Sequence, residues 1–90
     1  MTALKEMLEG VRAEFGRDSH ESLIAFHLAE GELIDPDPRV RVSMTAIMPH
    51  LPGNKYRMRR ALHRIADAGL LRRVVVSGKT FYHLPREEDR

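Results

Sequence analysis

Hydrophobic and polar residues alternate with helical periodicity in four stretches of the chain, and two later stretches have the composition of strands. The first stretch predicts an amphipathic helix, because its hydrophobic residues lie three or four positions apart, at Leu4, Met7, Leu8, Val11 and Phe15. Thr2 is a candidate N-cap and Gly16 ends the helix. This stripe either packs on its own domain or forms a dimer seam, because Leu4, Leu8, Val11 and Phe15 have near-heptad spacing. The two roles are compatible.

A second helix is expected after Asp18 and Glu21, which form a capping-box pair. The run from Leu23 to Ala29 is apolar almost all round, which predicts a central, buried helix. Gly31 is the expected C′ residue after its last turn. His27 lies inside this run, where a core or helix-end role is favoured over metal binding.

The middle of the chain predicts a loop, a short strand and a short helix. Asp35-Pro36-Asp37-Pro38 is incompatible with a helix because of its two prolines. In residues 39–43 polar and apolar side chains alternate, as in an edge strand. Ser43 or Thr45 then caps a third helix, which Pro49 is expected to distort. The inward residues of that helix are Met44, Ile47 and Leu51.

The fourth helix is predicted from the cap Asn54 to about Ala68, where Gly69 stops it. Its apolar side carries Met58, Ala61, Leu62 and Ile65, and its polar side is rich in arginine. Residues 70–76 and 80–84 are β-branched or aromatic runs around Ser77-Gly78-Lys79, which predicts a hairpin.

Charge is divided sharply along the chain. Residues 1–37 hold three basic and nine acidic side chains, whereas residues 38–86 hold eleven basic and one acidic. The formal net charge of +2 conceals this division. A basic block of this kind favours a polyanion as partner, because each neutralised phosphate releases condensed counterions.

Length and composition exclude several classes of protein. Ninety residues predict one domain at 18–85, preceded by a helical segment at 1–17 and followed by a polar tail at 86–90. The absence of cysteine excludes disulfides and thiolate metal sites and fits a cytoplasmic protein. Neither a membrane span nor a secretory signal is expected. The five histidines lack H-E-x-x-H spacing, and no phosphate-binding glycine loop occurs, so we expect no metal, no cofactor and no enzyme activity.

Two segments resemble a known family. Met58-Arg59-Arg60-Ala61-Leu62-His63-Arg64-Ile65-Ala66-Asp67-Ala68-Gly69-Leu70-Leu71 resembles the recognition helix of bacterial ArsR- and MarR-type transcription regulators. Gly78-Lys79-Thr80-Phe81-Tyr82-His83-Leu84 is similar to their wing. The turn Pro52-Gly53, the proline at 49 and the pair Tyr56-Arg57 depart from the family pattern, and the metal-binding cysteines of many ArsR-type repressors are absent.

The resemblance implies an α+β, mostly helical fold: a winged helix-turn-helix with an extra N-terminal helix and a C-terminal β-hairpin wing. The helix at 54–68 would enter the major groove, about 12 Å wide. The wing at 77–80 would reach the minor groove or the backbone. The base-edge candidates are Tyr56, Arg57 and Arg60. The phosphate candidates are Ser43, Thr45, Asn54, Lys55, Arg59, Arg64 and Lys79.

The resulting hypothesis is a sequence-specific transcription regulator, a homodimeric repressor that binds double-stranded DNA. Three alternatives stay open. The first is a winged-helix protein–protein interaction module of a larger assembly. The others are a replication or plasmid-maintenance protein and an RNA-binding protein.

Overall fold

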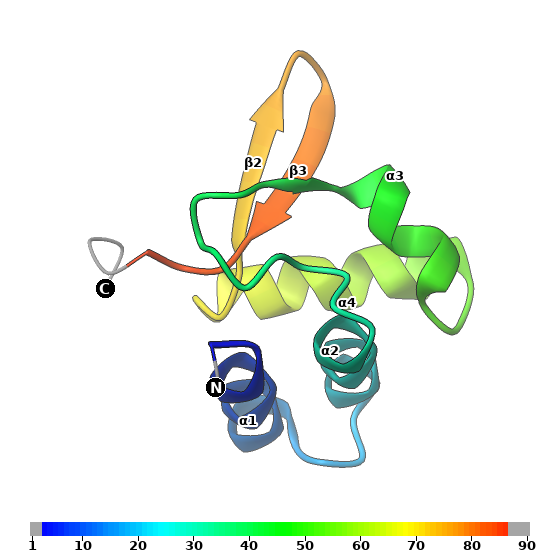
Figure 1. Ribbon diagram of the computed structural model, residues 1–90. Coiled ribbons are helices and arrows are strands. Elements are labelled where there is room, and N and C mark those ends of the chain that lie inside the picture. The colour runs from blue at the N-terminus through cyan, green and yellow to red at the C-terminus, as the bar shows by residue number, and fades with distance from the viewer. Residues whose placement is uncertain (1–2, 87–90) are drawn as a thin grey trace.

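Two helices lie side by side at one end of the molecule, a small sheet lies at the other, and a long helix crosses between them (Figure 1). The computed structural model describes residues 3–86, and the predicted Thr2 cap and the tail beyond Arg86 lie outside them. The elements are α1 (Ala3–Phe15), α2 (His20–Glu30), β1 (Val42–Ser43), α3 (Met44–Ile47), the 3-10 helix η1 (Met48–His50), α4 (Lys55–Asp67), β2 (Arg72–Val76) and β3 (Lys79–His83). The fold is α+β and about half helical. No helix within the described residues has the length and apolar character needed to cross a bilayer.

The sheet is antiparallel, with the strand order β1-β3-β2. Its hairpin is confirmed: Ser77 and Gly78 both have positive φ, 52° and 78°, and Val76 pairs with Lys79. Two positive φ values in a two-residue loop match the right-handed twist of the flanking strands. The edge strand predicted at residues 39–43 is present but shorter, because only Val42–Ser43 pairs with β3.

Ser43, rather than Thr45, caps the third helix. The Ala46 backbone N–H donates to the Ser43 hydroxyl oxygen at 3.2 Å. The expected distortion at Pro49 is confirmed, because α3 ends at Ile47 and a 3-10 turn containing Pro49 follows. Proline has no N–H to continue an α-helix, and its ring clashes with the preceding turn.

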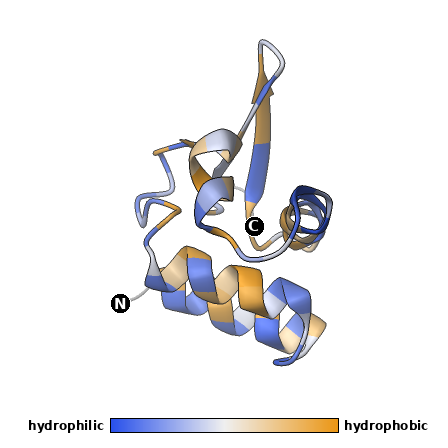
Figure 2. Cartoon of the chain, turned by 90° about the vertical axis from the view of Figure 1, so that its right-hand side faces the viewer, coloured by the Kyte–Doolittle hydropathy of each residue, from blue (hydrophilic) through white to orange (hydrophobic). Residues whose placement is uncertain are grey.

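The apolar side of α4 forms the centre of the core. Met58, Ala61, Leu62 and Ile65 are all buried, as predicted. Figure 2 looks nearly along this helix and shows hydrophobic residues on its inner side and hydrophilic residues outward. Both α2 and β2 contact it, so α4 joins the helix pair to the sheet.

The first helix packs on its own domain, which confirms the first of its two predicted roles. Leu8 is 7% exposed and Val11 is fully buried by the same chain, so neither offers surface for the dimer seam proposed for them. Leu4 and Phe15 are partly buried against the core. A Cβ on Gly10 would lie 2.7 Å from a methyl carbon of Leu70, so the glycine permits this close approach.

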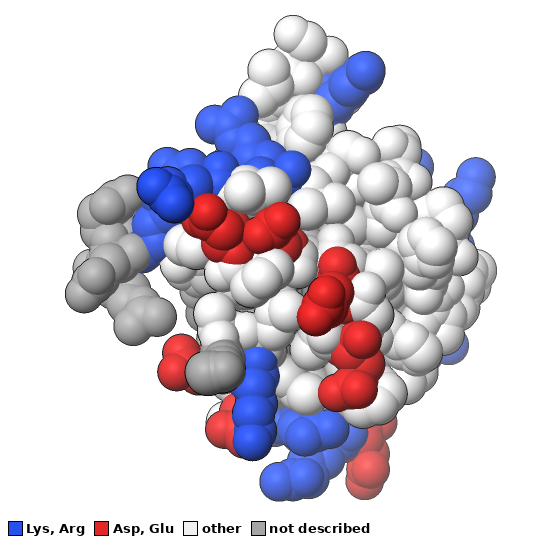
Figure 3. Space-filling model, viewed as in Figure 1, with Lys and Arg blue, Asp and Glu red and all other residues white. Residues whose placement is uncertain are grey.

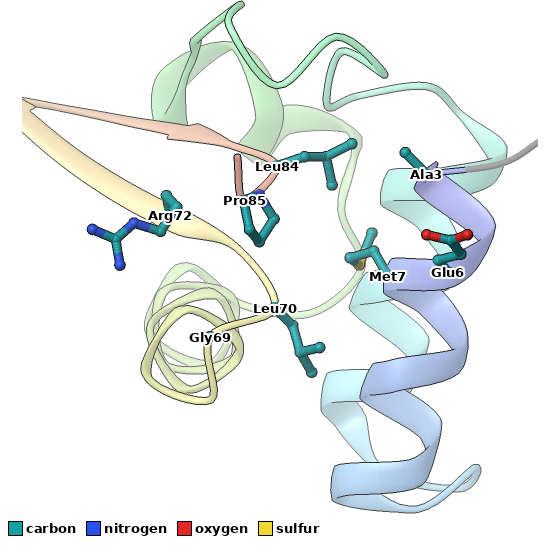
Figure 4. Close-up of a pocket in the computed structure, with 8 residues that line it drawn as sticks. All are labelled: Ala3, Glu6, Met7, Gly69, Leu70, Arg72, Leu84 and Pro85. Carbon is teal, nitrogen blue, oxygen red and sulfur yellow. The ribbon is translucent and has the colours of Figure 1, made fainter. Parts of the chain in front are cut away.

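Beside this contact, α1 and the sheet enclose a cavity of about 300 Å³ (Figure 4). Met7, Leu70 and Leu84 line it, and the Arg72 side chain points away from α1. Glu6 lines it as well, so both apolar and charged residues border this gap between α1 and the rest of the domain.

The second helix differs from its prediction in two respects. Its N-cap is Ser19 rather than Asp18: the Ser22 N–H donates to the Ser19 hydroxyl at 3.1 Å. The helix is also not buried all round, because Leu23 is 44% exposed and Phe26 is 41% exposed. Its two helical contacts, with α1 and α4, leave that side uncovered.

The C-terminal turn of α2 places an ordinary residue where glycine was expected. Gly31 is the C-cap with φ −85°, and Glu32 adopts the left-handed conformation with φ 50°. The Leu33 N–H donates to the Leu28 carbonyl at 3.0 Å and the Glu32 N–H to the Ala29 carbonyl at 3.3 Å. This is a Schellman motif with Glu32 at C′, a position that favours glycine.

Replacing Glu32 with glycine should therefore stabilise the protein. We expect Glu32→Gly to raise the free energy of unfolding by about 0.5–1 kcal/mol, because glycine adopts positive φ without a Cβ clash. Glu30→Gly removes the same charge two residues earlier, inside α2, and should lower it by about 0.5–1 kcal/mol. Urea unfolding of both variants and the wild type measures this, and a loss of stability in Glu32→Gly would contradict the strain assigned to it.

Candidate nucleic-acid interface

The first two turns of α4 present a basic surface to solvent. Tyr56 is 73% exposed, and the neighbouring cations are exposed as well: Lys55, Arg57, Arg59 and Arg60. We call these five residues the α4 basic face. It lies open, as the sequence predicted, because the hydrophobic residues of the same helix are committed to the core.

The start of α4 is fixed by a cap and a glycine turn. The Arg57 N–H donates to Asn54 Oδ1 at 2.9 Å, so Asn54 is the predicted N-cap. Gly53 has φ +98°, and a Cβ there would lie 3.3 Å from the His20 ring. Glycine thus allows the turn to pack closely against the beginning of α2. His20 Nε2 is buried there without a hydrogen-bond partner.

A cleft of about 690 Å³ separates the α4 basic face from the sheet. Its walls come from α3, α4, β2 and β3, and the residues that line it are Met44, Tyr56, Arg59, Arg60, His63, Arg73, Thr80 and Tyr82. We call it the α4–sheet cleft. Three arginines and no carboxylate line it, so the cleft suits a negatively charged ligand.

Tyr82 and Arg73 form the sheet side of this cleft. They are direct partners across β2 and β3, and Tyr82 is only 2% exposed. Burial raises the pKa of the Tyr82 phenol, an effect that the charge and hydrogen bond of the neighbouring Arg73 oppose. The Arg73 side chain thus begins directly opposite a buried, neutral phenol. Sequence reasoning missed Arg73, Thr80 and Tyr82, although the hairpin register would have placed Arg73 beside Tyr82.

Arg64, one of the predicted phosphate ligands, forms an ion pair with α2. Its Nη1 lies 2.9 Å from Glu21 Oε2, and the Glu21 side chain is only 10% exposed. The Arg64 guanidinium also lies 5.4 Å from the centre of the Phe15 ring. Arg64 thus connects α4 with α1 and α2, while half of its side chain remains exposed.

The remaining predicted phosphate ligands divide into two groups. Ser43 and Asn54 already use their side-chain oxygens as helix caps, and Thr45 Oγ1 lies 3.2 Å from Ser43 Oγ. The second group is free of such bonds in the described structure: Lys79 is exposed at the beginning of β3, next to the hairpin turn.

His63, which was not a predicted ligand, lines the α4–sheet cleft. Its Nε2 lies 3.4 Å from Asp67 Oδ2 on the outer side of α4.

The division of charge in the sequence is only partly a division in space. In the view of Figure 3, Asp and Glu side chains lie over the helix pair and the loop that follows it, and Lys and Arg side chains lie beside the sheet. Further basic side chains appear at the right and lower edges of the view. Among residues 3–86, no three His, Asp or Glu side chains gather in a way that could hold a metal ion.

Comparison with known proteins found no match to a family model, a curated protein or a solved structure. The features of the molecule that bear on function are therefore the α4 basic face and the α4–sheet cleft.

Arg64 and Arg60 give a matched test of these assignments. Arg64→Ala leaves the nearly buried Glu21 carboxylate without its partner, and we expect a loss of about 1–3 kcal/mol in the free energy of unfolding. Arg60→Ala removes an exposed side chain and should change stability by about 0.5 kcal/mol or less. Chemical denaturation compares the two, and equal stabilities would show that the Glu21–Arg64 pair does not brace α4.

Proposed function

We propose that the protein binds duplex DNA as a winged helix-turn-helix transcription regulator. The order of elements supports this: α2, β1, α3, a turn, α4 and the β2–β3 hairpin follow one another as that fold requires. The strand order β1-β3-β2, with β1 leading directly into α3, agrees with it as well. In this interpretation α4 is the recognition helix, the hairpin is the wing, and α1 is an extra helix N-terminal to the winged helix-turn-helix.

The observation that carries the proposal is the exposure of the α4 basic face beside a cationic cleft. A helix fits the major groove of B-DNA, about 12 Å wide, and must be convex and uncovered to enter it. When a helix lies in the groove, the sugar–phosphate backbone runs along its flanks. The α4–sheet cleft lies on one such flank and provides Arg59 and Arg73 to that backbone.

Different side chains then have different tasks. Arg57 and Arg60 contact base edges, because a guanidinium can bind guanine O6 and N7 in a bidentate manner. Tyr56 contacts a thymine methyl group or a phosphate. Lys55, Arg59, Arg73 and Lys79 contact phosphates, which position the protein without reading sequence. Such a cytoplasmic protein would repress transcription by occluding a promoter.

Binding to a labelled random-sequence duplex, followed by fluorescence anisotropy at increasing salt, tests the proposal. Four phosphate contacts per protomer predict that the logarithm of the association constant falls with the logarithm of salt concentration with a slope of about −3 to −4 for each bound protomer. Competition with single strands and structured RNA distinguishes duplex DNA from RNA as partner. Absence of duplex binding at low salt would favour the interaction-module alternative, in which α4 contacts an acidic protein.

Arg60→Ala and Lys79→Ala should affect binding in different ways. Loss of a bidentate arginine contact costs about 1–3 kcal/mol at one base pair, so Arg60→Ala should relax specificity at that position. Lys79→Ala should weaken all sequences alike and reduce the salt slope by about 1. Selection of bound sequences from random duplex measures the change in specificity, and anisotropy at increasing salt measures the affinity loss and the salt slope, each with both variants. Identical sequence preferences and equal affinity losses for the two variants would contradict the assignment.

A further inference from the structure

The outer side of α2 carries an apolar patch that the fold leaves uncovered. Leu23 and Phe26 are each more than 40% exposed, and they lie one helical turn apart on the same side of the helix. Single exposed hydrophobic residues are ordinary, whereas adjacent ones surrounded by charged side chains indicate a contact surface. This patch lies apart from the α4–sheet cleft, none of whose lining residues comes from α2, but one of the hollows beside it is also lined by Arg57 of the α4 basic face. Arg57 therefore borders both the apolar patch and the surface proposed for DNA.

Hollows of opposite charge flank Phe26. On one side, a hollow of about 540 Å³ is lined by Arg12, Arg17 and Arg57 against the single carboxylate of Asp18. On the other side, a hollow of about 670 Å³ has three carboxylates against two cations, with apolar walls between α1 and α2. Its carboxylates are Glu9, Glu30 and Glu32, its cations are Lys5 and Arg12, and its apolar residues include Leu4, Leu8 and Ala29.

We propose that this surface, centred on Leu23 and Phe26, is a two-fold interface with a second copy of the same chain. A two-fold axis between these two residues sets the α2 helices antiparallel and places Leu23 against the partner's Phe26. The same operation brings Arg17, before the helix, opposite the partner's Glu32, after it. It also directs Glu30 to the N-terminus of the partner's α2, where a carboxylate is favoured by the helix dipole.

The arrangement of charge favours a second copy over a different partner. A two-fold interface is self-complementary, because every contact occurs twice with the roles exchanged. Here the hollow near the start of α2 has more cations than carboxylates, and the hollow near its end has more carboxylates than cations. Arg17 and Glu32 lie at equal separation along the sequence from the apolar centre of the helix. A partner of uniform charge would meet repulsion at one of the two ends. The proposed interface lies on α2 and replaces the one expected on α1, because Leu8 and Val11 of α1 are already buried within the chain.

Sedimentation velocity of the full chain without DNA tests the interface, so its outcome is separate from that of the proposed function. We expect dimers in the micromolar range and an increase of more than about tenfold in the dimer dissociation constant for Leu23→Ser/Phe26→Ser. Val75→Ser is the matched control, because Val75 is 53% exposed on β2, away from this surface, and should leave the dimer intact. Circular dichroism checks that each variant is folded.

A charge exchange tests the orientation of the two copies. Arg17→Glu and Glu32→Arg should each weaken the dimer about three- to tenfold, because each change creates two repulsive contacts across the axis. The double variant Arg17→Glu/Glu32→Arg should restore it. A wild-type chain that stays monomeric up to about 100 μM would overturn the proposal. A dimer unaffected by Leu23→Ser/Phe26→Ser, or single charge variants that the double variant does not rescue, would overturn it as well.

Discussion

The packing of one side of α4 against the core determines the orientation of everything else on that helix. Leu62 and Ile65 are fully buried, and together with Met58 and Ala61 they fix the rotation of α4 about its axis. With 3.6 residues per turn, the positions between them must then face outward. The arginines at 57, 59 and 60 are exposed for this reason, and no separate interaction is needed to hold them open. The spacing of hydrophobic residues along α4 thus both buries one side of the helix and exposes its arginines.

The ends and flanks of α4 are held as firmly as its buried side. The Asn54 cap and the glycine turn before it set where the helix begins, and the Glu21–Arg64 pair ties its third turn to α2. On the other flank, Arg73 is kept beside the cleft by its position opposite Tyr82. A basic surface mounted on rigid neighbours keeps a fixed shape. Such a surface can match the regular spacing of phosphates on a duplex better than a flexible basic tail can.

Sequence alone predicted most of the local structure. The cap at Asn54, the distortion at Pro49 and the hairpin around Ser77-Gly78 follow from backbone rules that act over a few residues, and the structure confirms them. The exposure of Leu23 and Phe26 was not predictable, because a helix that is apolar all round gives no periodic signal of which side its neighbours leave open. The cap at Ser19 was missed because Asp18 and Glu21 have capping-box spacing, whereas Ser19 is followed three residues later by Ser22.

The candidate site was predicted on α4 and, on the sheet, at Ser43 and Lys79, whereas the cleft residues Arg73, Thr80 and Tyr82 were not predicted. Spacing along one helix identified the α4 basic face, but the cleft requires residues from four elements, which only the assembled fold brings together. The ion pair of Arg64 could not be predicted for the same reason: its partner Glu21 lies 43 positions away, and no local rule connects the two residues.

The central claim is that the α4 basic face lies along a duplex. It is tested most directly by nuclear magnetic resonance, with the backbone amides of the labelled protein followed during titration with a short random-sequence duplex at low salt. The account predicts that the largest shift changes fall on the first two turns of α4, on the start of α3 and on the hairpin. Changes confined to α1 and α2, or none under these conditions, would contradict it.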